Sequence, residues 1–166
     1  MSRLAYLSLV PTSRSSRPNE AWLRGLRPTD EEGVANFDTT FPGHYEGRAT
    51  HIHTLLHTDA TVRNNDIIVE TTFTHIGQTV WDQSVRDKVE LLSPYTEKEQ
   101  NVTLNSDDRV FSAESGDGSD PALKYVQLGD NIEDGFLVWI ILAVNTSLTS
   151  TASAAAIYYE TGSVEQ

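Results

Sequence analysis

The chain contains no cysteine among its 166 residues. This absence excludes disulfide bonds, thiolate metal sites and cysteine nucleophiles, and it leaves the redox compartment of the protein undecided. Basic residues are also scarce, because 12 Lys and Arg stand against 24 Asp and Glu and give a net charge of −12. Such a charge repels nucleic acid and anionic membranes, so we expect neither as a partner.

Long hydrophobic runs are absent as well. The longest, FLVWIILAV at 136–144, has nine residues, which is too short to span a membrane and predicts a buried strand. Other short runs rich in β-branched and aromatic residues alternate with turn-forming residues, which favours antiparallel strands. We therefore predict one all-β domain over 1–166, an antiparallel β-sandwich, with a flexible Ser/Thr/Ala-rich tail at 145–166.

One amphipathic stretch, WDQSVRDKVELLSPY, interrupts the strand pattern. It places Val85, Val89 and Leu92 on one helical face, and its start at Asp82 is typical of an N-cap. Pro94 lies beyond its end, where a proline stops a helix. The sequence therefore predicts a single short helix.

All five histidines lie between His44 and His75. His51 and His53 are two residues apart in a β-like run, so their side chains project from the same face of a strand and can share a metal ion. The Pro42–Gly43 pair predicts a turn that carries Tyr45 back toward His51. A tyrosine phenolate is a hard anionic donor that suits Fe(III), and Arg48 adds a fixed positive charge for an anionic substrate.

Two other interpretations of the histidines stay open at this point. His75, on the next long β-like run, could complete a three-histidine zinc site of a hydrolase with His51 and His53. Alternatively, the histidines are ordinary half-exposed strand residues of a non-catalytic binding module. Gln78 is expected to act as an outer donor near any such site, with His44 and His57 peripheral.

The segment PGHYEGRATHIH resembles the iron-ligand segment of the intradiol ring-cleavage dioxygenases, the catechol and protocatechuate dioxygenase family. The similarity continues through WLRGLRPTDEEGV before it and through HIGQTVWDQSV and YVQLG after it, from about Trp22 to Tyr159. The longer pattern is similar to the fungal extracellular branch. The resemblance implies a β-sandwich that holds a non-haem Fe(III) through two tyrosines and two histidines.

Residue by residue, the resemblance implies that Tyr45 and Arg48 are catalytic. Tyr45 corresponds to the tyrosine ligand that the substrate displaces, and Arg48 to the active-site arginine of the family. His51 and His53 correspond to the two histidine ligands. Gln78 then aligns with a glutamine near the metal.

His75 becomes a residue that lines the substrate pocket or supports the ligands. The implied reaction is the cleavage of a catechol-type ring between its two hydroxyls by O₂, which gives a muconate-type diacid. A pseudoenzyme of the same fold is the alternative from another functional class.

The chain departs from the family at its start. The first tyrosine ligand normally lies upstream of the WLRG segment in a GxYSG-type motif, and here only Tyr6 is a candidate, without the glycines. Either Tyr6 fills this role or the domain is an N-terminally shortened form with three protein ligands and impaired activity; we expect the shortened form. The resemblance also implies an extracellular location, although the start is a poor signal peptide, and it allows a dimer.

Overall fold

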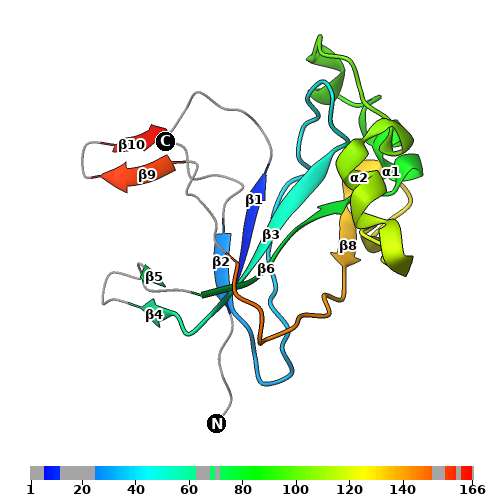
Figure 1. The fold of residues 1–166 in the computed structure, drawn as a ribbon. Helices are drawn as coiled ribbons and strands as arrows, with labels where there is room; N and C mark the ends of the chain where they lie inside the picture. Colours follow the sequence, from blue (N-terminus) through cyan, green and yellow to red (C-terminus); the bar gives the residue numbers. More distant parts are fainter. Residues whose placement is uncertain are drawn as a thin grey trace. The chain divides into compact units, whose positions relative to one another are not determined.

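The computed structural model describes residues 6–11, 25–62, 68–69, 72–150, 156–159 and 162–165 (Figure 1). Strands dominate these residues and helices are few and short, which confirms the prediction of a β-rich fold. No helix in this part of the chain combines the length and the apolar character that a membrane span requires. The strands are β1 Tyr6–Pro11, β2 Gly25–Pro28, β3 His51–Thr58, β4 Thr61–Val62, β5 Ile68–Val69, β6 Thr72–Val80, β7 Lys124–Gln127, β8 Phe136–Trp139, β9 Ala156–Tyr159 and β10 Gly162–Glu165.

Two compact units make up the chain. The first comprises Met1–Thr40, His53–Gly77 and Val144–Gln166, and the second comprises Phe41–Ile52 and Gln78–Ala143. The prediction that residues 1–166 form one domain stays a prediction. The helices of the second unit are α1 Gln83–Val89 and α2 Arg109–Glu114, with 3₁₀ turns η1 Tyr95–Glu97, η2 Asn105–Asp107, η3 Gly116–Gly118 and η4 Ile132–Asp134.

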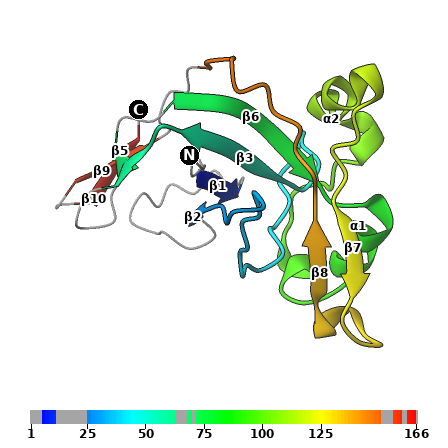
Figure 2. The same ribbon diagram turned by 90° about the horizontal axis from the view of Figure 1, so that it is seen from below.

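A four-stranded sheet with the order β2-β1-β3-β6 is the largest sheet of the described structure. Strands β1 and β2 pair antiparallel, from Tyr6 opposite Pro28 to Leu9 opposite Gly25. The long strands β3 and β6 run beside each other in both views (Figures 1 and 2). Their side chains also meet, because the His57 and Phe73 rings lie 4.8 Å apart. The other sheets are the two-stranded pairs β4-β5, β7-β8 and β9-β10.

The segment predicted as a tail carries regular structure at several points. Strands β9 and β10 form an antiparallel pair within it. The backbone N–H of Ser150 donates a hydrogen bond of 2.7 Å to the Phe73 carbonyl of β6. The flexibility of this segment stays a prediction.

Helix α1 forms where the sequence predicted it. The Asp82 side chain accepts a hydrogen bond from the Ser84 backbone N–H at 2.9 Å, which satisfies one of the N–H groups that a helix start leaves unpaired. Val85 and Val89 are buried on its inner face. They belong to a core in which the Trp81 ring lies 4.4 Å from that of Phe41 and 6.0 Å from that of Phe136.

Two predictions about this unit were wrong. A second helix, α2, occupies 109–114, whereas the sequence predicted a single short helix, and Asp108 caps it. The run 136–144 is not a buried strand, because β8 ends at Trp139 and Ile141 beyond it is 89% exposed. A two-stranded sheet has few neighbours, so only one face of β8 reaches the core through Phe136, while Leu137 and Trp139 are exposed.

We predict that Val85→Ala lowers the free energy of unfolding by roughly 1–3 kcal/mol, because it opens a cavity under a side chain that is now 1% exposed. Urea unfolding measures the change. Leu91→Ala is the matched control just beyond the same helix, at a position that is 77% exposed, and should change stability little. Equal losses from both variants would contradict the described core.

Candidate active site

A four-residue turn from Tyr45 to Arg48 carries two of the predicted functional side chains. The Arg48 backbone N–H donates to the Tyr45 carbonyl at 3.4 Å, and the two residues form an isolated antiparallel bridge. Gly47, the third residue of the turn, has φ +85°, a conformation that a side chain would strain. The chain therefore reverses at 45–48, and our placement of this turn at Pro42–Gly43 was wrong.

The segment just before this turn is fastened to the rest of the second unit. His44 is buried, with Nδ1 2.7 Å from the Glu90 carboxylate and Nε2 2.8 Å from the Gln100 carbonyl. The Tyr95 hydroxyl donates to the Phe41 carbonyl at 2.8 Å, and the Lys98 ammonium donates to the His44 carbonyl. His44 therefore has an anchoring role that the sequence did not indicate.

Tyr45 and His51 lie next to each other, as the sequence predicted. Their ring centroids are 5.9 Å apart and the ring planes are inclined at 59°. His51 is the first residue of β3 and is completely buried. Its Nδ1 lies 2.6 Å from the Ala49 carbonyl, which can only accept, so Nδ1 carries a proton and, in the neutral ring, the lone pair is on Nε2. Metal-binding histidines are commonly oriented by such a hydrogen bond.

His53 follows two positions later in β3 and is half-buried. Strand geometry therefore projects its side chain from the same face as that of His51. Tyr6 begins β1, which is the neighbour of β3 in the four-stranded sheet, and its side chain lies outside the described structure.

His75 and Gln78 both lie on β6, where their side chains do different things. The His75 ring lies over Gly77, because a Cβ at position 77 would approach His75 Nε2 to 2.7 Å. The Gln78 side chain instead contacts Arg48, since its Oε1 accepts a hydrogen bond from Arg48 Nη2. Among the described residues, no three His, Asp or Glu side chains gather as a metal site. The three-histidine zinc interpretation therefore has no support in this part of the chain.

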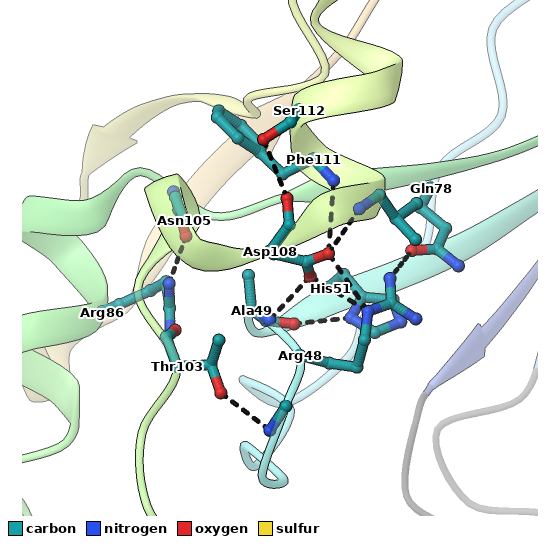
Figure 3. Close-up of polar contacts among 12 residues, drawn as sticks. Arg48, Ala49, His51, Gln78, Arg86, Thr103, Asn105, Asp108, Phe111 and Ser112 are labelled. Atoms are coloured by element: carbon teal, nitrogen blue, oxygen red, sulfur yellow. Dashed lines mark hydrogen bonds and ion pairs between the residues drawn. The ribbon is translucent and has the colours of Figure 1, made fainter.

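Asp108 holds Arg48 from the other side, a contact that no sequence pattern indicated. Its two carboxylate oxygens lie 3.2 and 3.1 Å from Arg48 Nε (Figure 3). One oxygen also accepts the Ala49 N–H at 2.8 Å, and the other accepts the Val110 N–H at 2.7 Å. Burial alone would raise the pKa of Asp108, but the hydrogen bonds from the Ala49 and Val110 backbone and from Arg48 outweigh burial and lower this pKa.

A second buried ion, Arg86 of α1, fixes the segment that precedes Asp108. Arg86 donates to the Asn105 side chain and to the Thr103 carbonyl, and it is completely buried. Burial lowers the pKa of Arg86, although the nearby Glu90 carboxylate partly opposes this effect. The Thr103 hydroxyl in turn accepts a hydrogen bond from the Gly47 N–H at 2.9 Å, in the middle of the Tyr45 turn. Figure 3 shows this network from α1 to the turn.

Comparison with solved structures identifies the fold. The chain is similar to an intradiol ring-cleavage dioxygenase from Tetranychus urticae, with a TM-score of 0.67 and 25% sequence identity over 89% of this chain and 74% of that chain. In fold, the chain is similar to the intradiol ring-cleavage dioxygenases. A crystal structure of a further dioxygenase matches with the same TM-score and coverage at 24% identity. No protein-family model and no curated protein matches the sequence.

The resemblance read from the sequence is thus confirmed at the level of the intradiol dioxygenase family. The fungal extracellular branch stays a prediction. Of the residues that the resemblance implies, the structure brings together Tyr45 and His51 by their rings, and Arg48 and Gln78 by a hydrogen bond.

We predict that Arg86→Met lowers the free energy of unfolding by roughly 2–4 kcal/mol, because the buried Asn105 side-chain oxygen and the part-buried Thr103 carbonyl lose their donor. Chemical unfolding measures this loss. Lys88→Met, at an exposed position of the same helix, is the control and should change stability by less than about 0.5 kcal/mol. Equal stability of the two variants would show that Arg86 does not hold the 103–105 segment.

The lowered pKa of Asp108 makes its contribution to stability dependent on pH. The carboxylate stabilises the fold fully above its ordinary pKa of 3.8, and this contribution is lost as the pH falls through the lower folded value. We therefore expect wild type to be more stable than Asp108→Asn at about pH 7 and the difference to shrink at about pH 2.5. Urea unfolding at both values measures it. A difference that is unchanged in acid would argue against a buried, charged Asp108.

Proposed function

We propose that this chain is a non-haem Fe(III) dioxygenase that cleaves a catechol-type ring between its two hydroxylated carbons. The substrates are a small phenol with adjacent hydroxyls and O₂, and the product is a muconate-type diacid. The observation that supports this most is the pairing of the Tyr45 ring with a buried His51 whose Nδ1 is held by a carbonyl. Structural similarity to an intradiol ring-cleavage dioxygenase supports the reaction class.

The donors present fit a ferric ion. Tyr45, His51 and His53 would hold it, since a phenolate oxygen stabilises the ferric state and an imidazole Nε2 with its lone pair is a common ligand. The hydrogen bond from His51 Nδ1 to Ala49 sets both the tautomer and the ring orientation that such a ligand needs. The sandwich closure of the sheets also belongs to this proposal, as do the extracellular location and the dimer.

A ferric ion held by these residues would supply the Lewis-acid and redox chemistry that makes a catechol-type ring reactive toward O₂, and both oxygen atoms of O₂ would enter the diacid. The Tyr45 phenolate accepts a proton from a catechol hydroxyl, because a phenolate and a catechol have similar proton affinities. Arg48 lies at the other end of the same turn and stabilises negative charge on the oxygens of the substrate. Gln78 accepts from the Arg48 side chain and so limits its movement.

Metal analysis and a visible spectrum of the purified chain test this proposal. We expect iron bound to the protein, a red-brown colour from tyrosinate-to-Fe(III) charge transfer, and one O₂ consumed for each catechol cleaved. Removal of the iron by a chelator should abolish colour and cleavage together. A colourless chain that takes up no ferric iron would support the non-catalytic binding module instead.

Tyr45→Phe tests the assigned ligand, because it removes the phenolate oxygen and keeps the ring. We expect it to lose most of the charge-transfer absorption and to reduce cleavage by at least about a hundredfold. Tyr125→Phe is the matched control, since Tyr125 is an exposed tyrosine that packs on Phe136 and should leave the spectrum unchanged. A variant Tyr45→Phe with the wild-type spectrum would exclude Tyr45 as the ligand.

A further inference from the structure

Asp108 does more than start a helix. One of its oxygens, Oδ1, accepts from the Val110 and Phe111 N–H groups at 2.7 and 3.3 Å, which is the capping interaction of α2. The other oxygen, Oδ2, accepts from the Ala49 N–H at 2.8 Å, at the start of β3. Arg48 Nε contacts both oxygens. Capping α2 requires only Oδ1, so the contacts of Oδ2 with Ala49 and Arg48 serve another purpose.

Asp82, which caps α1, provides the comparison within the same molecule. Its Oδ1 accepts from the Ser84 backbone and hydroxyl groups, and among the described residues no arginine side chain contacts the Asp82 carboxylate. Asp82 is only half-buried, whereas Asp108 is 1% exposed. A buried carboxylate is costly unless its oxygens are filled by donors, and at Asp108 the donors come from the Tyr45 turn and β3 as well as from the helix.

The contacts of Arg48 fix the orientation of its guanidinium. Nε is held by Asp108 on one side, and Nη2 donates to Gln78 on the other. Because the guanidinium is planar, two fixed nitrogens determine the position of the third. Nη1 has no hydrogen-bond partner among the described residues.

We propose that Asp108 is a positioning residue of the dioxygenase, which clamps Arg48 through Nε so that the remaining guanidinium edge is presented to an anionic phenolic substrate. This inference rests on the proposed function. Clamping matters because an unrestrained arginine would have to be ordered each time substrate binds, which costs rate. Asp108 itself does not contact the reacting atoms.

The first experiment observes the clamp without catalysis. Nitrogen-15 NMR of the metal-free full chain follows the exchange of the Arg48 Nε–H with solvent. We expect slow exchange in wild type and exchange at least about tenfold faster in Asp108→Asn, which keeps an oxygen for the α2 cap and replaces the second oxygen by a donor. Asp82→Asn removes the charge of the other helix cap and should leave the Arg48 signal unchanged. Equally fast exchange in wild type and Asp108→Asn would overturn the proposal.

The second experiment is a double-mutant cycle on catechol cleavage by the iron-loaded chain. If Asp108 acts through Arg48, Asp108→Asn should reduce kcat by roughly tenfold or more in wild type and by less than about twofold in an Arg48→Gln background. Iron content and the charge-transfer spectrum should stay as in the parent proteins. The same loss of kcat in both backgrounds would overturn the proposal and leave Asp108 a purely structural residue.

The two experiments separate failure of this inference from failure of the proposed function. Wild-type chain that binds no iron, or binds it without opening the ring, would refute the proposed function. The exchange of the Arg48 Nε–H then decides by itself whether the clamp exists. Intact cleavage together with an unprotected Arg48 would instead refute the clamp alone.

Discussion

The buried carboxylate of Asp108 is the interaction on which the candidate site depends. It joins three separate segments of the second unit, which are the turn at Tyr45–Arg48, the start of β3 at Ala49 and the N-terminus of α2. A charge that is 1% exposed is tolerated only where donors surround it. Two of these donors, Arg48 Nε and the Ala49 N–H, belong to the segment that joins Tyr45 to His51. The cost of burying this carboxylate therefore makes the site arrangement specific.

Behind Asp108, a second polar layer connects the site to the core. Val85 and Val89 fix α1 by apolar packing, and the helix holds Arg86 in a fully buried position. Arg86 then fixes the 103–105 backbone, which holds the turn through Thr103 and leads into Asp108. The site residues themselves are buried to different degrees, since Tyr45 and Arg48 are only half-buried. Their positions are thus determined by a hydrogen-bonded network, and a network of this kind is rigid only when all its members are present.

Features encoded within a few residues were predictable from the sequence. Helix α1 was found because its cap at Asp82 and its buried valines lie within two turns. The pairing of Tyr45 with His51 was also predicted, but through the wrong turn. Both Gly43 and Gly47 are turn formers, and only the backbone conformation, with φ +85° at Gly47, distinguishes them. The run 136–144 was misread because nine apolar residues indicate burial on both faces, whereas β8 has a single neighbour, β7.

The clamp on Arg48 was beyond such reasoning, because Asp108 lies 60 positions further along the chain. The letters SDDRVF carry the signature of an N-cap, and a cap predicts contacts with the next residues only. No sequence pattern indicates that Asp108, which caps α2, also binds the side chain of Arg48. The family resemblance did not supply it either, since no role for this carboxylate follows from the motifs around Tyr45 and His51.

The charge balance at the site limits what Arg48 can contribute to substrate binding. The chain carries a net charge of −12, and the Arg48 cation is largely neutralised by the Asp108 carboxylate that contacts it. Neither the overall field nor this pair therefore attracts a catechol anion strongly over a distance. Under the proposed function, the charge that captures the substrate is that of the ferric ion, which is the largest local charge in such a site. An arginine that is paired with a carboxylate then contributes oriented hydrogen bonds rather than net charge, because the planar guanidinium donates in fixed directions. The carboxylate that weakens the cation is also the group that orients it under the proposed clamp, so the contribution of Asp108 to the chemistry lies in the two acceptor oxygens that it offers to Arg48 Nε.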